Sequence, residues 1–78
     1  MPAITDIAAI ANRIYYGGTF CPFIAFFIAN GDNSYLYNIP CKAWETVANG
    51  AIMHFITENA REISAQEMWE ILKETRNG

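Results

Sequence analysis

The segment IPCKAW contains two neighbouring side chains whose types can do chemistry. Cys41 stands beside Lys42 at the first turn of a helix that is predicted from the apolar pattern starting at Ala43. A helix dipole and a nearby ammonium both lower the pKa of a thiol, so one hypothesis is a thiol-dependent enzyme or sensor that uses Cys41. In the alternative, Cys41 is a small residue in a turn from strand to helix, and no C-x-x-C motif supports redox chemistry.

His54 is the only histidine of the chain, and a nucleophilic Cys–His pair needs the two side chains within hydrogen-bond reach. On one continuous helix Cys41 and His54 are about 20 Å apart, so they do not pair within one chain. We therefore expect His54 to be a boundary residue beside an apolar stripe. No spacing resembles a metal-ligand set, and Gly17–Gly18 lacks the pattern of a phosphate-binding loop. The sequence thus predicts no catalytic residue, no metal and no cofactor.

Two groups of residues are candidates for binding a protein partner. Three glutamates project from one side of a predicted helix, where they either meet a basic partner or form a solvated face. Tyr and Trp combine apolar area with a polar tip, so they are favoured at interfaces, although they also line the rims of cores. The tyrosines and tryptophans that exceed the needs of a small core are Tyr15, Tyr16, Tyr35, Tyr37, Trp44 and Trp69. The residues selected for partner binding are Glu67, Glu70, Glu74, Tyr35, Tyr37 and Phe27.

The composition indicates one small folded domain, residues 1–78, with apolar surface to spare. The chain has 78 residues, of which 53% are hydrophobic and 14% aromatic, which argues against disorder. Only 17% are charged, against about 25% in a typical soluble domain. The net charge is −3, and the five Lys and Arg residues are scattered. Nucleic-acid binding is therefore disfavoured, because it needs a basic stripe.

The N-terminal segment has no basic region and carries Asp6, so it does not resemble a signal peptide. No apolar run reaches the roughly 20 residues that a membrane span needs. We expect a cytoplasmic protein whose cysteines are free thiols. The alternation of side chains supports the same expectation, because it places Cys21 and Cys41 on opposite faces of a predicted hairpin, where they cannot form a disulfide.

The elements that must position these residues begin with a predicted helix over 3–16. Thr5 and Asp6 suit a helix start, and apolar residues recur at helical spacing from Ile7 to Ile14. Gly17–Gly18 then suits a helix end.

The segment FCPFIAFFIANG, residues 20–31, fits both a helical stripe and a strand. The hairpin signal NGDN and the alternating SYLYNI that follow it favour a hairpin of 22–29 with 34–39. A loop on Gly31–Asp32 pairs Phe26 with Tyr37, and a loop on Asn30–Gly31 pairs Phe26 with Tyr35. In either register both faces of the hairpin are apolar and both edges are open.

Two more helices are predicted after the hairpin. The first begins at Ala43 and carries an unbroken apolar stripe from Trp44 to Ile56, which crosses Asn49–Gly50 in phase. The last covers 65–76 and starts with a capping box, Ser64 and Glu67, and a hydrophobic staple, Ile63 and Met68. The residues expected to face inward on this helix are Ala65, Met68, Trp69 and Leu72.

The sequence therefore predicts a small α+β domain of order helix–β-hairpin–helix–helix, with the hairpin packed on the helices. We expect a non-enzymatic protein-binding or regulatory protein that acts as a homodimer, because a second copy is the simplest cover for apolar faces and open edges. Small, compact proteins without catalytic motifs include bacterial and phage accessory proteins, such as inhibitors of host factors. The alternatives are a small-molecule-binding protein with an aromatic-lined pocket and the thiol-dependent enzyme or sensor.

Overall fold

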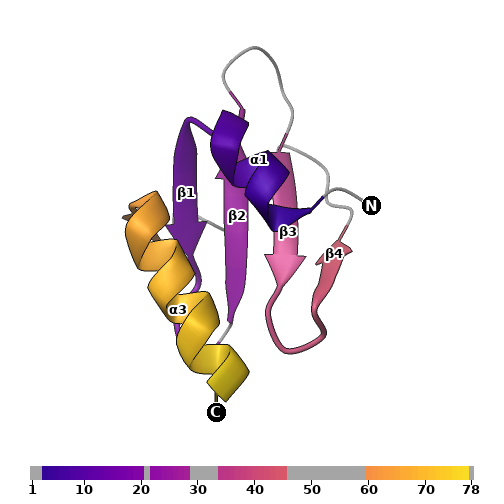
Figure 1. The fold of residues 1–78 in the computed structure, drawn as a ribbon, viewed down its shortest axis with the longest axis vertical. Helices are drawn as coiled ribbons and strands as arrows, with labels where there is room; N and C mark the ends of the chain where they lie inside the picture. Colours follow the sequence, from indigo (N-terminus) through magenta and orange to yellow (C-terminus); the bar gives the residue numbers. More distant parts are fainter. Residues whose placement is uncertain (1–2, 21, 29–33, 46–59, 78) are drawn as a thin grey trace.

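The computed structural model describes residues 3–20, 22–28, 34–45 and 60–77. Within these residues, five strands form one antiparallel sheet of order β4-β3-β2-β1-β5, and two helices lie on one of its faces (Figure 1). In chain order the elements are α1 (Ile4–Ile10), β1 (Arg13–Tyr16), β2 (Phe23–Phe27), β3 (Ser34–Asn38), β4 (Ala43–Glu45), β5 (Arg61–Ile63) and α3 (Ala65–Asn77). The first four strands are neighbours in chain order, and β5 returns to pair with β1.

The predicted order of helix, hairpin, helix and helix is wrong, because the hairpin is the centre of a wider sheet. The predicted helix over 3–16 ends at Ile10, and Arg13–Tyr16 is the strand β1. Ile14 pairs with Phe26, and Tyr16 pairs with Ile24. β-branched and aromatic residues suit a strand, so pairing with β2 prevails over a helical spacing that is equally visible in the sequence.

The predicted hairpin is confirmed as β2 and β3. Phe26 pairs with Tyr35, which is the register expected for a loop on Asn30–Gly31; that loop lies outside the described residues. The alternation of faces is also as predicted, since Ile24 and Phe26 lie in one core cluster and Ala25 in another. The apolar segment is covered at its edges by β1 and β3, which makes β2 the central strand.

The helix predicted from Ala43 is wrong at its start, where Ala43–Glu45 form the edge strand β4. Trp44 pairs with Tyr37, and their ring centroids are 5.2 Å apart. The indole of Trp44 also lies 5.7 Å from the ring of Phe26 and 6.0 Å from that of Tyr35. This cross-strand aromatic cluster stabilises the edge of the sheet. The remainder of the predicted helix, with Asn49–Gly50 and His54, lies outside the described residues.

The main core lies between the sheet and the two helices. α1 crosses β2 and β3 near one end of the sheet, while α3 runs over β1 (Figure 1). The buried residues of this core are Ile7, Ile14, Ile24, Phe26, Ile39, Ile63 and Met68. On the opposite face of the sheet, Phe23 and Ala25 are buried beside Tyr15, Phe27, Leu36 and Ala60.

The start of α3 follows the predicted local signals in part. The backbone N–H of Glu67 donates to Ser64 Oγ at 3.1 Å, and the staple residues Ile63 and Met68 are both buried in the main core. The carboxylate of Glu67 binds Arg61 at 2.6 Å. Of the residues expected to face inward, Met68 is buried and Leu72 half-buried, whereas Ala65 and Trp69 are exposed. The helix packs through Met68, Ile71 and Leu72, so its inner stripe is rotated from the predicted one.

Candidate functional site

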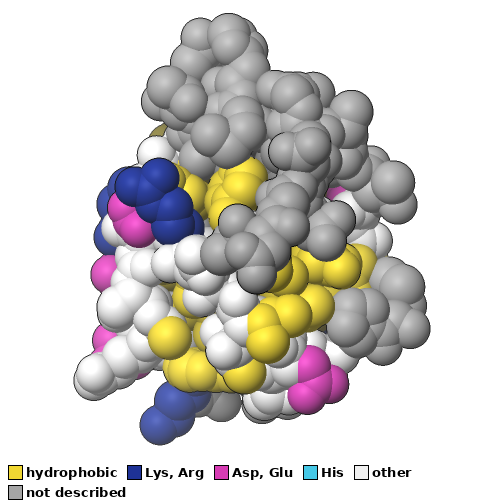
Figure 2. Space-filling view, turned by 90° about the horizontal axis from the view of Figure 1, so that it is seen from above, with side chains coloured by type: hydrophobic (Ala, Val, Ile, Leu, Met, Phe, Trp, Pro, Cys, Tyr) yellow, Lys and Arg dark blue, Asp and Glu magenta, His cyan; other side chains and the backbone are white. Residues whose placement is uncertain are grey.

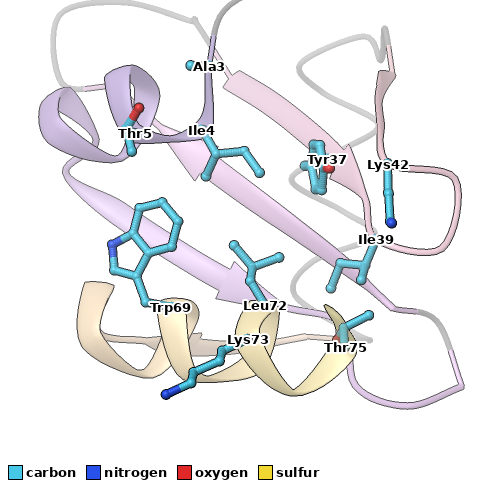
Figure 3. A pocket seen from close by; sticks show the side chains of 10 residues that line it. All are labelled: Ala3, Ile4, Thr5, Tyr37, Ile39, Lys42, Trp69, Leu72, Lys73 and Thr75. Carbon is cyan, nitrogen blue, oxygen red and sulfur yellow. The ribbon is translucent and has the colours of Figure 1, made fainter. Parts of the chain in front are cut away.

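A cavity of about 720 Å³ lies between α1, α3 and the turn that joins β3 to β4 (Figure 3). α1 and α3 cover different parts of the sheet, so the end of β3 forms the floor where neither helix covers it. The described residues that line the cavity are Ala3, Ile4, Thr5, Tyr37, Ile39, Lys42, Trp69, Leu72, Lys73 and Thr75.

The walls of the cavity are mainly apolar. Ile4 reaches into it from α1 and Leu72 from α3, and Tyr37 lies at its back (Figure 3). Trp69 stands on α3 one turn before Leu72 and remains 41% exposed. An exposed indole beside half-buried aliphatic side chains offers apolar area that a ligand can remove from water.

Lys42 is carried by a turn with defined hydrogen bonds. The backbone N–H of Cys41 donates to Asn38 Oδ1 at 3.1 Å, and that of Lys42 donates to the carbonyl of Ile39 at 3.2 Å. The amide of Asn38 donates to Glu45 at 3.0 Å, which ties the turn to β4. Lys42 has a φ of 53°, in the left-handed region, where a side chain costs about 1–2 kcal/mol. Strain of this kind is often found at functional positions.

The charges around the cavity differ from those of the rest of the chain. The sequence contains two lysines, Lys42 and Lys73, and both line the cavity. Within the described residues neither has an ion pair, whereas Arg13 pairs with Glu62 at 3.5 Å and Arg61 with Glu67 at 2.6 Å. No carboxylate is found among the described lining residues. The cavity is therefore a positive site in a chain of net charge −3.

A second hollow, of about 490 Å³, lies on the other flank of α3. Its described lining residues are Tyr16, Thr19, Arg61, Glu67, Glu70, Ile71, Glu74 and Thr75. The hydrogen bond from Arg61 lowers the pKa of Glu67. The guanidinium of Arg61 also lies 5.8 Å from the ring centre of Tyr16, which suits a cation–π interaction.

The six residues predicted to bind a partner do not form one surface. Glu67, Glu70 and Glu74 are brought together at the second hollow. Tyr35 and Tyr37 pack around Trp44 on the helix-covered face. Phe27 lies on the opposite face against Tyr15, with ring centroids 5.6 Å apart.

The helix that was expected to activate Cys41 is absent at that position. Cys41 is an exposed free thiol in the turn between β3 and β4, and the chain continues from it into a strand. Cys21 and His54 lie outside the described residues, so the prediction of two free thiols stays a prediction for Cys21. Among the described residues, no group of three or more His, Cys, Asp and Glu side chains is placed to hold a metal ion.

The sequence reasoning missed the residues that distinguish the cavity. The sequence pattern treats Lys42 only as a neighbour of Cys41 and does not single out Lys73. It counts Trp69 among the aromatic residues in excess of a small core, yet expects it to face inward on its helix. One signal was available, because the chain has only two lysines in a composition rich in aromatic residues. That signal does not show that Lys42 and Trp69 meet, since they belong to distant parts of the chain.

No helix in the described part of the chain is both long and apolar enough to cross a membrane. Comparison of the chain with protein families, curated proteins and solved structures gives no significant match.

Proposed function

We propose that this chain is a binding protein whose ligand, a small molecule with an apolar body, occupies the cavity between α1 and α3. The observation that carries the proposal is the exposed indole of Trp69 at an apolar cavity. A volume of about 720 Å³ lies in the range of about 300–1,000 Å³ that is usual for small-molecule sites. The few polar groups among the aliphatic and aromatic walls also match such sites.

A neutral apolar dye tests this proposal without assuming the charge of the ligand. N-phenyl-1-naphthylamine becomes strongly fluorescent when it leaves water, so its titration reports binding directly. We expect saturable binding by the wild-type chain and at least a tenfold loss in Trp69→Ala, because the indole supplies much of the exposed apolar wall.

Phe20→Ala is the matched control for the dye experiment. Phe20 is a fully exposed aromatic residue that is not among the described residues lining the cavity. Its removal should leave dye binding within about twofold of wild type, since an exposed substitution changes little else. Absence of saturable binding, or equal losses in the two variants, would contradict the proposed function.

A second candidate function, binding of a protein through the other flank of α3, is favoured by the hollow that gathers the three glutamates. Glu70 and Glu74 are exposed and have no ion pair in the described part of the chain. This arrangement fits a basic segment of a protein partner, with charge complementarity acting mainly on the association rate. Exchange of both residues for lysine should leave the fold intact and reduce capture of the native partner at low salt. Unchanged capture would show that the glutamates form only a solvated face.

The proposal of a homodimer is supported by the apolar surface that remains exposed. Ile10, at the end of α1, is 56% exposed, and Trp69 is also accessible. Figure 2, which views the molecule from the end where α1 lies, shows hydrophobic side chains near the middle of the face and charged ones toward its margins. Light scattering at micromolar concentration should give twice the chain mass of 8.8 kDa; a monomer would remove this proposal.

A further inference from the structure

We propose that the ligand of this cavity is a monoanionic amphiphile, an apolar chain or ring with one carboxylate, whose charged group binds Lys42 while its body lies along Leu72 and Trp69. This inference rests on the proposed function and adds the chemical class of the ligand. It is carried by three observations: the unpaired charges at the cavity, the place of Lys42 in it, and the absence of an arginine among its described lining residues.

The charge of the cavity favours an anion over a neutral or cationic molecule. Arg13 and Arg61 are each paired with a carboxylate, while in the described part of the chain the two lysines at the cavity are not. Lys42 is exposed, and an apolar ligand body lying against the walls would displace water beside its ammonium, which strengthens the attraction for an anion. A cationic ligand would be repelled by the ammonium of Lys42.

The direction of the two lysines assigns the contact to Lys42. Lys42 extends from its turn along one side of the cavity, and Trp69 lies toward the other side (Figure 3). The ammonium of Lys73 points away from the other labelled side chains, so that only its stem lines the wall (Figure 3). The turn that carries Lys42 is held by Asn38, which limits the positions its backbone can take.

Besides the two lysines, the described polar side chains of the wall are the hydroxyls of Thr5, Tyr37 and Thr75, and no arginine is among the described lining residues. The hydroxyl of Thr75 donates its proton to the carbonyl of Ile71 at 2.8 Å. A phosphate has three acceptor oxygens and is usually bound by several donors, often an arginine fork or consecutive backbone N–H groups. A carboxylate is smaller and is satisfied by one ammonium and water, which is what the Lys42 end provides.

Competition against the bound dye tests the ligand class with three probes of equal chain length. Decanoate, decanol and decyltrimethylammonium are titrated against N-phenyl-1-naphthylamine on the wild-type chain, below the micelle concentration of each probe. We expect decanoate to displace the dye about tenfold better than decanol, the size of one charge-assisted contact, and decyltrimethylammonium to be the weakest. The affinity should rise from octanoate to decanoate to dodecanoate, by roughly fourfold for each methylene that is buried.

Lys42→Gln and Lys73→Gln form a matched pair, since each removes one positive charge from the cavity lining. Lys42→Gln should lower the affinity for decanoate about tenfold and leave the affinity for decanol within about twofold of the wild-type value. Lys73→Gln should change decanoate by less than about threefold. Retention of dye binding by both variants shows that each is folded with its cavity intact, so a loss of decanoate alone is not a loss of structure.

The outcomes separate this inference from the proposed function. If the dye binds but decanol equals decanoate, or if Lys42→Gln leaves decanoate unchanged, the ligand is not an anionic amphiphile and the apolar cavity stands. If both lysine variants lose the same affinity for decanoate, the specific contact with Lys42 is overturned, and the anion is attracted only by the general positive potential of the cavity. If the dye does not bind the wild-type chain, the proposed function itself fails.

Discussion

The two flanks of α3 offer opposite environments although they share one helix. On one flank Trp69, Leu72 and Lys73 line an apolar cavity with unpaired positive charge. On the other, Glu67, Glu70 and Glu74 line a smaller hollow in which the nearby cation, Arg61, is already bound by Glu67. The difference teaches that one helix can separate unpaired positive charge beside apolar walls from a flank whose described cation is already paired with a carboxylate.

The largest expected effect comes from the residue that both flanks share. Met68 is fully buried beneath α3, and its replacement by Ala should cost about 2–5 kcal/mol. A domain of this size has only about 4–12 kcal/mol of stability. We expect urea denaturation to show this loss, with dye binding and the Arg61–Glu67 contact weakened together. Loss of one flank alone would show that the flanks do not depend on the same packing.

The capping residue gives the next effect. Ser64→Ala removes the acceptor for the Glu67 N–H and should destabilise the protein by about 1 kcal/mol. Because the cap acts on the first turn of α3, both flanks should be affected less than by Met68→Ala. Ser64→Asp keeps an acceptor at the cap and should restore the stability; a change below about 0.3 kcal/mol in the alanine variant would contradict the cap's contribution.

A substitution at Lys42 should separate the cavity from stability. Lys42→Gly relieves the left-handed backbone at a φ of 53°, and the gain, reduced by the entropy of glycine, should be about 0.5–1 kcal/mol. The same variant should lose affinity for decanoate, so it becomes more stable and binds less well. Lys42→Gln keeps the backbone strain and serves as the control; equal stability of the two variants would show that the strain is negligible.

The smallest effect is a pH dependence that belongs only to the acidic flank. Arg61 lowers the pKa of Glu67 below its ordinary value of 4.5, so the unfolded chain binds this proton more readily. The contribution to stability is therefore full above pH 4.5 and is lost as the pH falls through the lowered pKa. Thermal unfolding should show that Glu67→Gln loses slightly less stability between pH 6 and pH 3 than the wild type does. Glu70→Gln is the control, because it removes a carboxylate that has no ion pair in the described part of the chain. Identical pH profiles of stability for the wild type and Glu67→Gln would contradict this contribution of the Arg61–Glu67 pair.

Part of the site was accessible to sequence reasoning and part was not. The three glutamates at the second hollow follow from helical spacing, because side chains three and four residues apart share one side of a helix. The exposure of Trp69 does not follow from helical spacing. The same spacing fits a buried side of the helix that includes Trp69 and one that includes Ile71 in its place. Tyr35 and Tyr37 were placed correctly on one face, but their packing around Trp44 depends on a strand that the pattern assigned to a helix.

The sequence by itself determined the hairpin of β2 and β3 and the start of α3. Turn residues, alternation of apolar side chains and the Ser64 cap act between neighbours in the chain, so their signals are local. Only the tertiary structure decided that Arg13–Tyr16 and Ala43–Glu45 are strands, because the open edges of the hairpin supply hydrogen-bond partners that no local pattern records. The cavity was decided at the same level: it exists because α1 and α3 leave the end of β3 uncovered, and this brings Lys42 and Trp69 to one site.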